Sequence, residues 1–385
     1  MVLYSVHRSR GASGPVPLLI RDIRNLVGRT GRAGSTNRGL VICANDNQWD
    51  TVLLASGDTP GETVEGALIA LVRRLADVIS SNGLVLTNND LENSPALQQL
   101  VDGIDATLVE LVSDEMGAEE FEKLARGIID NTYAASAADD AQVGLLRTVA
   151  SLRATRLYEL RARGRLPVSR SSGLRPRMVE TVLDDLRVRF TGWGAVESSS
   201  DPEMISAVLD WALTRPEFSE SVANIFRQEE IEAAPGIIQQ LVTTWLEGST
   251  YADIAAAVGF DVDDLLRLHA KLVQFDLLTL VEQAVAVLTW EAEESGVELA
   301  PAVRTLPESL RFGATSSIAI GLMLGGLRHR RAAIELAADQ RVAATLLGRD
   351  WRNQIRDLLQ IEKLTWTSRL GELVYARTLE DVTKD

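Results

Sequence analysis

Two arginines stand three residues apart in a glycine-rich run near the start of the chain. The run reads Asn-Leu-Val-Gly-Arg-Thr-Gly-Arg-Ala-Gly over residues 25–34, so Arg29 and Arg32 each follow a glycine, Gly28 or Gly31. In a helix, residues i and i+3 share a face, which would point both guanidinium groups the same way. Two guanidinium groups beside a bare backbone suit the oxygens of a polyphosphate. The alternatives are a solvated basic helix and a Gly-Arg loop that touches nucleic acid.

The segments on either side of this run predict how the arginines are held. An apolar segment from Val2 to Val6 precedes the run, and a second one from Gly39 to Ala44 follows it. Short apolar segments of this kind are typical of buried parallel strands. The predicted order is therefore strand, helix, strand.

With this order, the run resembles the sixth conserved motif of superfamily-two helicases, Gln-x-x-Gly-Arg-x-Gly-Arg-x-Gly, which is followed by a strand beginning near Gly-x-x-Ile. The chain departs from the motif at Asn25, where glutamine is usual, but asparagine keeps the amide donor and acceptor on a shorter arm. The resemblance implies the C-terminal portion of a DEAD/DEAH-type, Ski-like helicase that starts within the second RecA-like lobe.

The resemblance also implies roles for individual residues. Arg32 would be the arginine finger on the γ-phosphate of ATP, and Arg29 would pair with the same phosphate or with an acidic box across the cleft. The implied nucleotide-binding set is completed by Asn25, Gly28 and Gly31. No residue of the chain is expected to bind a metal ion.

Two other parts of such a motor are missing from the sequence. No Gly-x-x-x-x-Gly-Lys-Ser/Thr phosphate loop is present. The pair Asp114-Glu115 ends a helical pattern instead of a buried strand, which argues against an acidic metal box. The resemblance therefore implies that ATP and Mg²⁺ are bound mostly by a missing N-terminal helicase lobe, supplied in cis or in trans. Whether this chain is an enzyme by itself stays open.

Beyond about residue 61 the apolar residues repeat at intervals of three and four, which predicts helices. The predicted helices cover residues 62–80, 94–115, 118–131, 140–162, 175–188 and 202–214. Residues 51–55 fit one more short strand. Residues 163–177 are rich in glycine, proline and serine, which predicts a loop or linker.

The predicted fold class is accordingly mainly α. A truncated α/β RecA-like segment at residues 1–60 is followed by a helical domain at 61–165, of a winged-helix or related type. A helical bundle at 175–300 and a C-terminal helical segment at 301–385 complete the predicted domains.

Residues 316–337 suggest a contact with nucleic acid. An apolar helix meets Gly325-Gly326, and the next helix carries Arg328, Arg330 and Arg331. The pattern resembles a helix-hairpin-helix, in which a glycine turn and a helix N-terminus hold a phosphate through backbone amides. It implies that the three arginines contact single-stranded nucleic acid. The alternative is a basic surface helix that packs against the acidic remainder of the chain.

Residues 250–272 have the two helices and the glycine turn of a helix-turn-helix DNA reader. The second helix opens with Asp261, Asp263 and Asp264, whose carboxylates would repel DNA phosphates. A structural helical hairpin is therefore the preferred interpretation, and a transcriptional regulator is the least favoured class.

Charge is unevenly distributed along the chain. Residues 1–40 carry seven arginines and one acidic residue, Asp22, which gives a net charge of +6. The rest of the chain therefore carries −21, and the total is −15. A basic N-terminal segment fits a phosphate-facing cleft, whereas the acidic remainder argues against nonspecific coating of nucleic acid. Cys43 is the sole cysteine, which excludes an intramolecular disulfide, and the three histidines are too scattered to suggest a metal cluster.

The sequence predicts neither a membrane span nor a secretory leader, and we expect a cytoplasmic protein. The expected function is that of the C-terminal part of an ATP-dependent helicase, with ATP, single-stranded DNA or RNA and the missing lobe as partners. The alternative is a noncatalytic helicase remnant that acts as a binding or scaffold protein.

Overall fold

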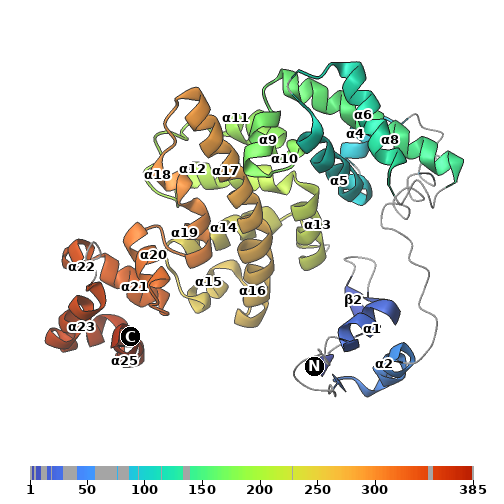
Figure 1. Cartoon of the computed structure of the whole chain (residues 1–385). Helices are drawn as coiled ribbons and strands as arrows, with labels where there is room; N and C mark the ends of the chain where they lie inside the picture. Colours follow the sequence, from blue (N-terminus) through green and yellow to red (C-terminus); the bar gives the residue numbers. More distant parts are fainter. Residues whose placement is uncertain are drawn as a thin grey trace. The chain divides into compact units, whose positions relative to one another are not determined.

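The computed structural model describes most of the chain, mainly as α-helix (Figure 1). The described residues are 2–3, 6–9, 15–18, 20–28, 41–56, 76, 86–93, 95–113, 115–132, 139–227, 229–345 and 350–383. The chain divides into two compact units. Unit 1 holds residues 1–85 and 127–148, and unit 2 holds residues 86–126 and 149–385.

The N-terminal part of unit 1 contains a parallel strand pair. Strand β1 (Val2–Leu3) runs parallel to β4 (Ile42–Cys43), with Val2 opposite Ile42 and Leu3 opposite Cys43. Parallel strands need a crossover connection, and this one includes an antiparallel hairpin, β2 (His7–Ser9) and β3 (Pro15–Pro17), and helix α1 (Ile20–Gly28). The predicted order of strand, helix and strand is confirmed.

Helix α1 faces a small apolar core through residues three apart. Ile23 is fully buried with Val6 and Val52, and Ile20 and Leu26 pack against them. Helix α2 (Trp49–Ser56) follows a short 3₁₀ turn, η3 (Asp46–Gln48), and packs against α1. Helices α1 and α2 and the residues beside the strands thus share one small core.

The prediction of a strand at residues 51–55 is wrong, because these residues belong to α2. The Asn45 side chain caps the turn that leads into this helix, accepting from the Asn47 amide at 3.1 Å. A capped turn directs the chain into helix, and a strand pattern of alternating burial does not form. Val52 is buried, whereas its neighbours Leu53 and Leu54 are each 52% exposed.

Unit 2 is helical throughout its described residues. Its elements up to residue 189 are α4 (Asn88–Asn93), α5 (Pro95–Leu111), α6 (Ala118–Asp130), α8 (Asp140–Ala162), α9 (Leu166–Ser172), α10 (Pro176–Thr181), the π-helical η4 (Val182–Leu186) and α11 (Arg187–Arg189). Helices α6 and α8 also contribute residues to unit 1.

The later elements of unit 2 extend to the end of the described chain. They are α12 (Pro202–Leu213), α13 (Pro216–Ile225), α14 (Ala234–Leu246), α15 (Tyr251–Val258), α16 (Val262–Leu268), the π-helical η5 (His269–Leu277), α17 (Leu278–Ser295), α18 (Pro301–Arg304), α19 (Leu306–Phe312), α20 (Ser317–Leu324), α21 (Arg330–Ala337), α22 (Gln340–Thr345), α23 (Trp351–Ile361), α24 (Lys363–Leu370) and α25 (Glu372–Thr383).

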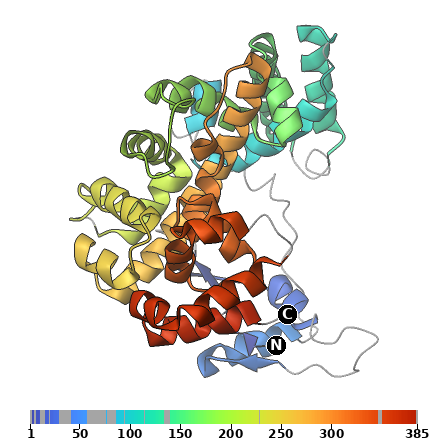
Figure 2. The ribbon, with the colours of Figure 1, turned by 90° about the vertical axis from the view of Figure 1, so that its left-hand side faces the viewer.

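Among the described residues, the helices that follow residue 165 enclose two hydrophobic cores. One core extends from Val168 to Leu310 and includes the fully buried Trp211. The other extends from Ala314 to Val382 and includes the fully buried Trp366. Figures 1 and 2 show the helices of the second core, coloured orange to red, gathered at one end of the bundle. We call them the C-terminal subdomain.

Helices α16, η5 and α17 join into one helix of 34 residues, Val262–Ser295. By length and a mean hydropathy of 1.5 it could cross a membrane, but 56% of its most apolar window is buried within the protein. It packs against α9, α10 and α19, as the core helix of a helical bundle does. The sequence did not indicate the full length of this helix, because charged residues such as Lys271 and Asp276 interrupt its apolar runs.

Most predicted helices are confirmed, but the predicted loop at 163–177 is wrong. Helix α9 lies inside it, with Pro167 in the first turn, where the missing N–H costs no hydrogen bond. Leu166 and Val168 anchor the helix in the core, and Gly173, at φ 66°, ends it. The described part of residues 61–165 contains helices and no strand, and the predicted helix at 62–80 lies outside the described residues apart from residue 76.

Candidate functional site

Helix α1 leads directly into the Gly-Arg run. Asn25 lies in its last two turns, and Gly28 is its final residue. Arg29, Gly31 and Arg32 lie outside the described residues, and the chain is described again from residue 41, just before β4. The nucleotide-binding and catalytic roles of these residues therefore stay predictions.

Arg330 is partly buried and joins α21 of the second core to Trp245 of the first. Its guanidinium carbon lies 3.8 Å from the centroid of the Trp245 ring. The guanidinium also donates to the backbone carbonyls of Trp245, at 3.2 Å, and of Ser249. These contacts favour the alternative in which the helix packs inside the protein, and a contact of Arg330 with nucleic acid stays a prediction.

Three aromatic side chains surround the site that receives Arg330. The rings of Trp245 and His269 lie 4.2 Å apart between centroids, and the Tyr251 hydroxyl lies 3.2 Å from His269 Nδ1. His269 Nε2 is buried and has no hydrogen-bond partner. Burial, and then the charge of Arg330, lower the pKa of His269 to about 4. His269 is therefore neutral at pH 7.

The glycine turn before α21 is also used inside the protein. The Gly325 and Gly326 amides donate to the carbonyls of Gly321 and Met323. A Cβ added at Gly325 would lie 2.5 Å from Trp351 Cζ2, so glycine is required here for the approach of α23. The two helices and the glycine turn of the predicted hairpin are present. The turn amides that would hold a phosphate bond to the protein instead.

Arg328 and Arg331, which flank Arg330, differ from it in exposure. Arg328 Nε donates to Asp381 Oδ1 at 2.8 Å, and the Arg328 amide donates to Asp381 Oδ2 at 3.0 Å. Arg331 donates to the carbonyl of Arg369 at 3.2 Å, and its side chain is exposed. These contacts favour the packing alternative for the hairpin. A contact of Arg328 or Arg331 with nucleic acid stays a prediction.

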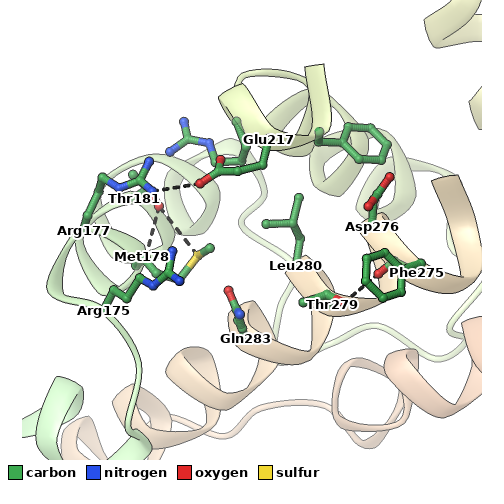
Figure 3. Close-up of a pocket in the computed structure, with 12 residues that line it drawn as sticks. Arg175, Arg177, Met178, Thr181, Glu217, Phe275, Asp276, Thr279, Leu280 and Gln283 are labelled. Atoms are coloured by element: carbon green, nitrogen blue, oxygen red, sulfur yellow. Dashed lines mark hydrogen bonds and ion pairs between the residues drawn. The ribbon is translucent and has the colours of Figure 1, made fainter. Parts of the chain in front are cut away.

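A cavity of about 250 Å³ in unit 2 brings together arginines that the sequence analysis did not select (Figure 3). We call it the arginine pocket. Three elements form it: the starts of α10 and α13 and the middle of the 34-residue helix. The lining residues that matter for its chemistry are Arg175, Arg177, Arg215, Glu217, Phe275 and Leu280.

The basic wall of the arginine pocket is held by carboxylates. Arg177 Nη2 donates to Glu217 Oε1 at 2.8 Å, and Arg175 Nη1 donates to Asp102 Oδ2 at 2.5 Å. Burial alone would raise the pKa of Glu217, but the hydrogen bond from Arg177 and the charges of Arg177 and Arg175 lower it below its ordinary value. The wall is therefore electropositive enough to keep a carboxyl group ionised.

The opposite wall presents an exposed aromatic ring. Phe275 is 64% exposed, and Lys271 Nζ lies 5.0 Å from the centroid of its ring. Lys271 also pairs with Asp276 at 2.7 Å. In Figure 3 the Leu280 side chain lies between this wall and the arginines. The pocket thus offers guanidinium donors on one side and an apolar, aromatic surface on the other.

The sequence did not predict this pocket, because its walls come from three segments far apart in the chain. A usable signal was present in the two Arg-Pro pairs, Arg175-Pro176 and Arg215-Pro216. Proline in the first turn of a helix places the preceding residue at the N-cap. Both arginines occupy that position, at the starts of α10 and α13.

A different arginine is fully enclosed, mostly by acidic partners. Arg153 on α8 has no exposed surface and donates to both carboxylate oxygens of Asp105, at 2.8 and 2.7 Å. It also donates to Glu92 Oε1 at 2.6 Å. Burial would lower the pKa of Arg153, but its hydrogen bonds with Asp105 and Glu92 and their charges raise it instead. This network ties α4, α5 and α8 together.

Among the described residues, no group of three or more histidine, cysteine, aspartate or glutamate side chains is placed to hold a metal ion. No protein-family model matches the chain, and no curated protein matches it.

Proposed function

We propose that the chain is the C-terminal portion of a Ski-like, superfamily-two helicase and completes an ATP-driven motor together with an N-terminal lobe that is supplied in cis or in trans. The observation that carries this proposal is the parallel pairing of β1 with β4 around α1. The Gly-Arg run lies between α1 and β4 in the sequence, as it does in the helicase motif it resembles.

The small size of this strand pair supports the proposal. Parallel strands occur almost always in larger sheets whose two faces are covered by helices. A two-stranded pair has too little buried surface to be stable alone. Ile42 of β4 is 49% exposed, although it belongs to an apolar strand. These features fit the edge of a larger α/β sheet whose other strands come from elsewhere.

In the proposed mechanism, Arg32 stabilises the charge that develops on the γ-phosphate during its transfer to water. Arg29 binds the same phosphate or the acidic box of the other lobe. The missing lobe binds the Mg²⁺ ion and most of the ATP molecule. An arginine finger typically contributes about 10³ to 10⁵ in rate, so the chain is indispensable to turnover without being sufficient for it.

The test is ATP turnover by the purified chain, with and without single-stranded nucleic acid, and again after addition of the polypeptide encoded upstream. Turnover is expected in the mixture alone. Arg32→Ala should then lower turnover by about 10³-fold or more. Arg24→Ala, which removes an exposed arginine from α1, should stay within about twofold of the natural chain.

The second candidate is a noncatalytic helicase remnant that acts as a scaffold. The lack of a phosphate loop in the sequence favours it. If the folded chain gives no ATP turnover in any mixture, the result would support this candidate and reject the motor.

A further inference from the structure

A short connection joins the C-terminal subdomain to the first core of unit 2. Helix α19 ends at Phe312, and α20 begins at Ser317 (Figure 1). Leu310 belongs to the first core, whereas Ala314 belongs to the second. Gly313 lies between them in the left-handed conformation, at φ 63°. Hinges are often formed by a few residues at the end of an element, so this glycine is placed to let one core turn relative to the other.

The Arg330 side chain of α21 reaches back across this connection. Its guanidinium group lies against the Trp245 ring and donates to the backbone carbonyls of Trp245 and Ser249. The indole of Trp245 is itself held in place, because its Nε1 donates to the Leu310 carbonyl at 2.7 Å. The first core therefore supplies the site, and the subdomain supplies the group that enters it.

Two glycines of the first core make room for α21. A Cβ at Gly313 would collide with Arg330 Nη1 and lie 2.6 Å from Trp245 Cε2. A Cβ at Gly248 would lie 2.5 Å from Ile334 Cδ1, one turn further along α21. An aromatic face, two carbonyl acceptors and the space beside a bare backbone suit the planar, forked guanidinium group.

The site holds the positive charge of Arg330 without an opposite charge. Among the described residues, Arg330 forms no ion pair with a carboxylate, and its partners are neutral. Burial of a cation without a counter-charge costs free energy, which the aromatic face and the carbonyls recover only in part. Arg153, in contrast, pairs with Asp105 and Glu92. The contact of Arg330 therefore stabilises less, and such a contact can open while both cores stay folded.

We propose that the C-terminal subdomain is a hinged module, which Arg330 latches onto the first core and which opens about Gly313 when the guanidinium group leaves its site. The vacated site would then accept a guanidinium group from outside. This inference does not depend on the function proposed above, because it concerns only the two cores of unit 2.

Single-molecule fluorescence energy transfer on the full chain tests the hinge. One dye is attached through Leu266→Cys on α16 and the other through Leu364→Cys on α24, at side chains that are 39% and 87% exposed, after Cys43→Ser. With the natural latch we expect one main population and an open state of at most about 10%. Arg330→Ala should raise the population of the open state at least about tenfold, seen as a second transfer efficiency.

A small cation tests whether the site is specific for a guanidinium group. Ethylguanidinium contains the atoms that Arg330→Ala removes. At millimolar concentration it should return this variant to the main population of the natural chain. Ethylammonium at the same concentration should not, because it lacks the planar fork of donors. Equal rescue by the two cations, or no rescue by either, would overturn the assignment of a guanidinium site.

A second variant keeps the arginine and fills its site. Gly313→Ala should also increase the open state, because the new methyl group displaces the guanidinium group. The matched controls are Gly296→Ala, at a left-handed helix end with nothing within 4 Å, and Arg331→Ala on α21. Both should keep the natural distribution.

Circular dichroism checks that every variant is folded, and Gly313→Ala decides the outcome if Arg330→Ala does not fold. The hinge is rejected if the folded variants at Arg330 and Gly313 give the same distribution as their controls. Because no nucleotide or second lobe takes part, either result leaves the test of ATP turnover and Arg32 unaffected.

Discussion

The arginines of unit 2 occupy two contrasting environments. Arg153 has no exposed surface, and Arg330 lies between the Trp245 ring and two backbone carbonyls. Arg175, in the arginine pocket, keeps more than half of its side chain in water. A guanidinium group held by such contacts inside the protein joins helices and leaves little access for a ligand. An exposed one, held in place by a carboxylate, can bind a ligand with little effect on stability.

The two kinds of arginine should therefore affect different measurements. Replacement of an enclosed arginine should lower the free energy of unfolding, whereas replacement of an exposed one such as Arg175 should change that free energy little and alter only what the pocket can bind.

Arg153→Met should lower the free energy of unfolding by about 3–5 kcal/mol, because Asp105 loses its charged partner and Glu92 keeps only Arg156, at 3.4 Å. Asp105 is 1% exposed, so water cannot replace the lost hydrogen bonds. Urea unfolding followed by circular dichroism measures the effect. The double variant with Asp105→Leu should recover part of the loss. A decrease of less than about 1 kcal/mol in the free energy of unfolding would mean that Arg153 contributes no more than a surface ion pair does.

Arg330→Ala should lower the free energy of unfolding by about 3 kcal/mol, through loss of the cation–π contact and of two charged hydrogen bonds. Arg331→Ala on the same helix is the control and should change stability by at most about 0.5 kcal/mol. Equal effects of the two replacements in urea unfolding would mean that burial does not distinguish these neighbours.

Acid should destabilise the junction around Arg330 through His269. The pKa of His269 is about 4 in the folded protein and about 6.5 when unfolded. Between these pH values the unfolded chain binds more protons, so the free energy of unfolding falls as the pH is lowered from about 6.5 to about 4. The histidine contribution should amount to about 2–3 kcal/mol over this range.

The control for this pH effect is His269→Gln, which has no titrating group. Unfolding of both proteins at several pH values isolates the contribution of the histidine. An identical pH dependence would show that other groups cause the loss of stability.

Gly313 and Gly296 offer a matched pair for the smallest effect. Both end helices in the left-handed conformation, at φ 63° and 67°. A Cβ at Gly313 would lie 2.6 Å from Trp245 Cε2, whereas at Gly296 nothing lies within 4 Å. Each replacement by alanine pays the backbone cost, and Gly313→Ala should cost about 1 kcal/mol more. Equal melting temperatures would mean that the Arg330 site adapts without strain.

Much of the secondary structure was predictable from local sequence. The amphipathic patterns at 94–115 and 118–131 correspond to α5 and α6, because a helix that buries one face repeats its apolar residues at three and four. Helix α9 escaped prediction because Pro167 and the nearby glycines look like loop residues unless the buried positions are known. The strand predicted at 51–55 was wrong for a different reason. The Asn45 side chain caps the turn that leads into helix α2.

The candidate sites were predictable only in part. The spacing of Arg29 and Arg32 is a local property, and together with the glycines and the flanking apolar segments it suggested a helicase motif. The sequence also indicated the glycine turn at 325–326. It did not indicate the partly buried position of Arg330, because the partner of this arginine, Trp245, lies 85 residues away in the sequence. The pocket was not predicted for a similar reason, since Arg175 and its partner Asp102 are 73 residues apart in the sequence.

From the sequence by itself came a mainly helical chain, the order of strand, helix and strand at its start, and the Gly-Arg run between the last two. Hydrophobic periodicity and glycine spacing are short-range properties, and sequence carries them directly. Only the tertiary structure decided which arginines are enclosed and which reach solvent. Burial and ion pairing depend on contacts between distant segments, which a reading of neighbouring residues does not contain.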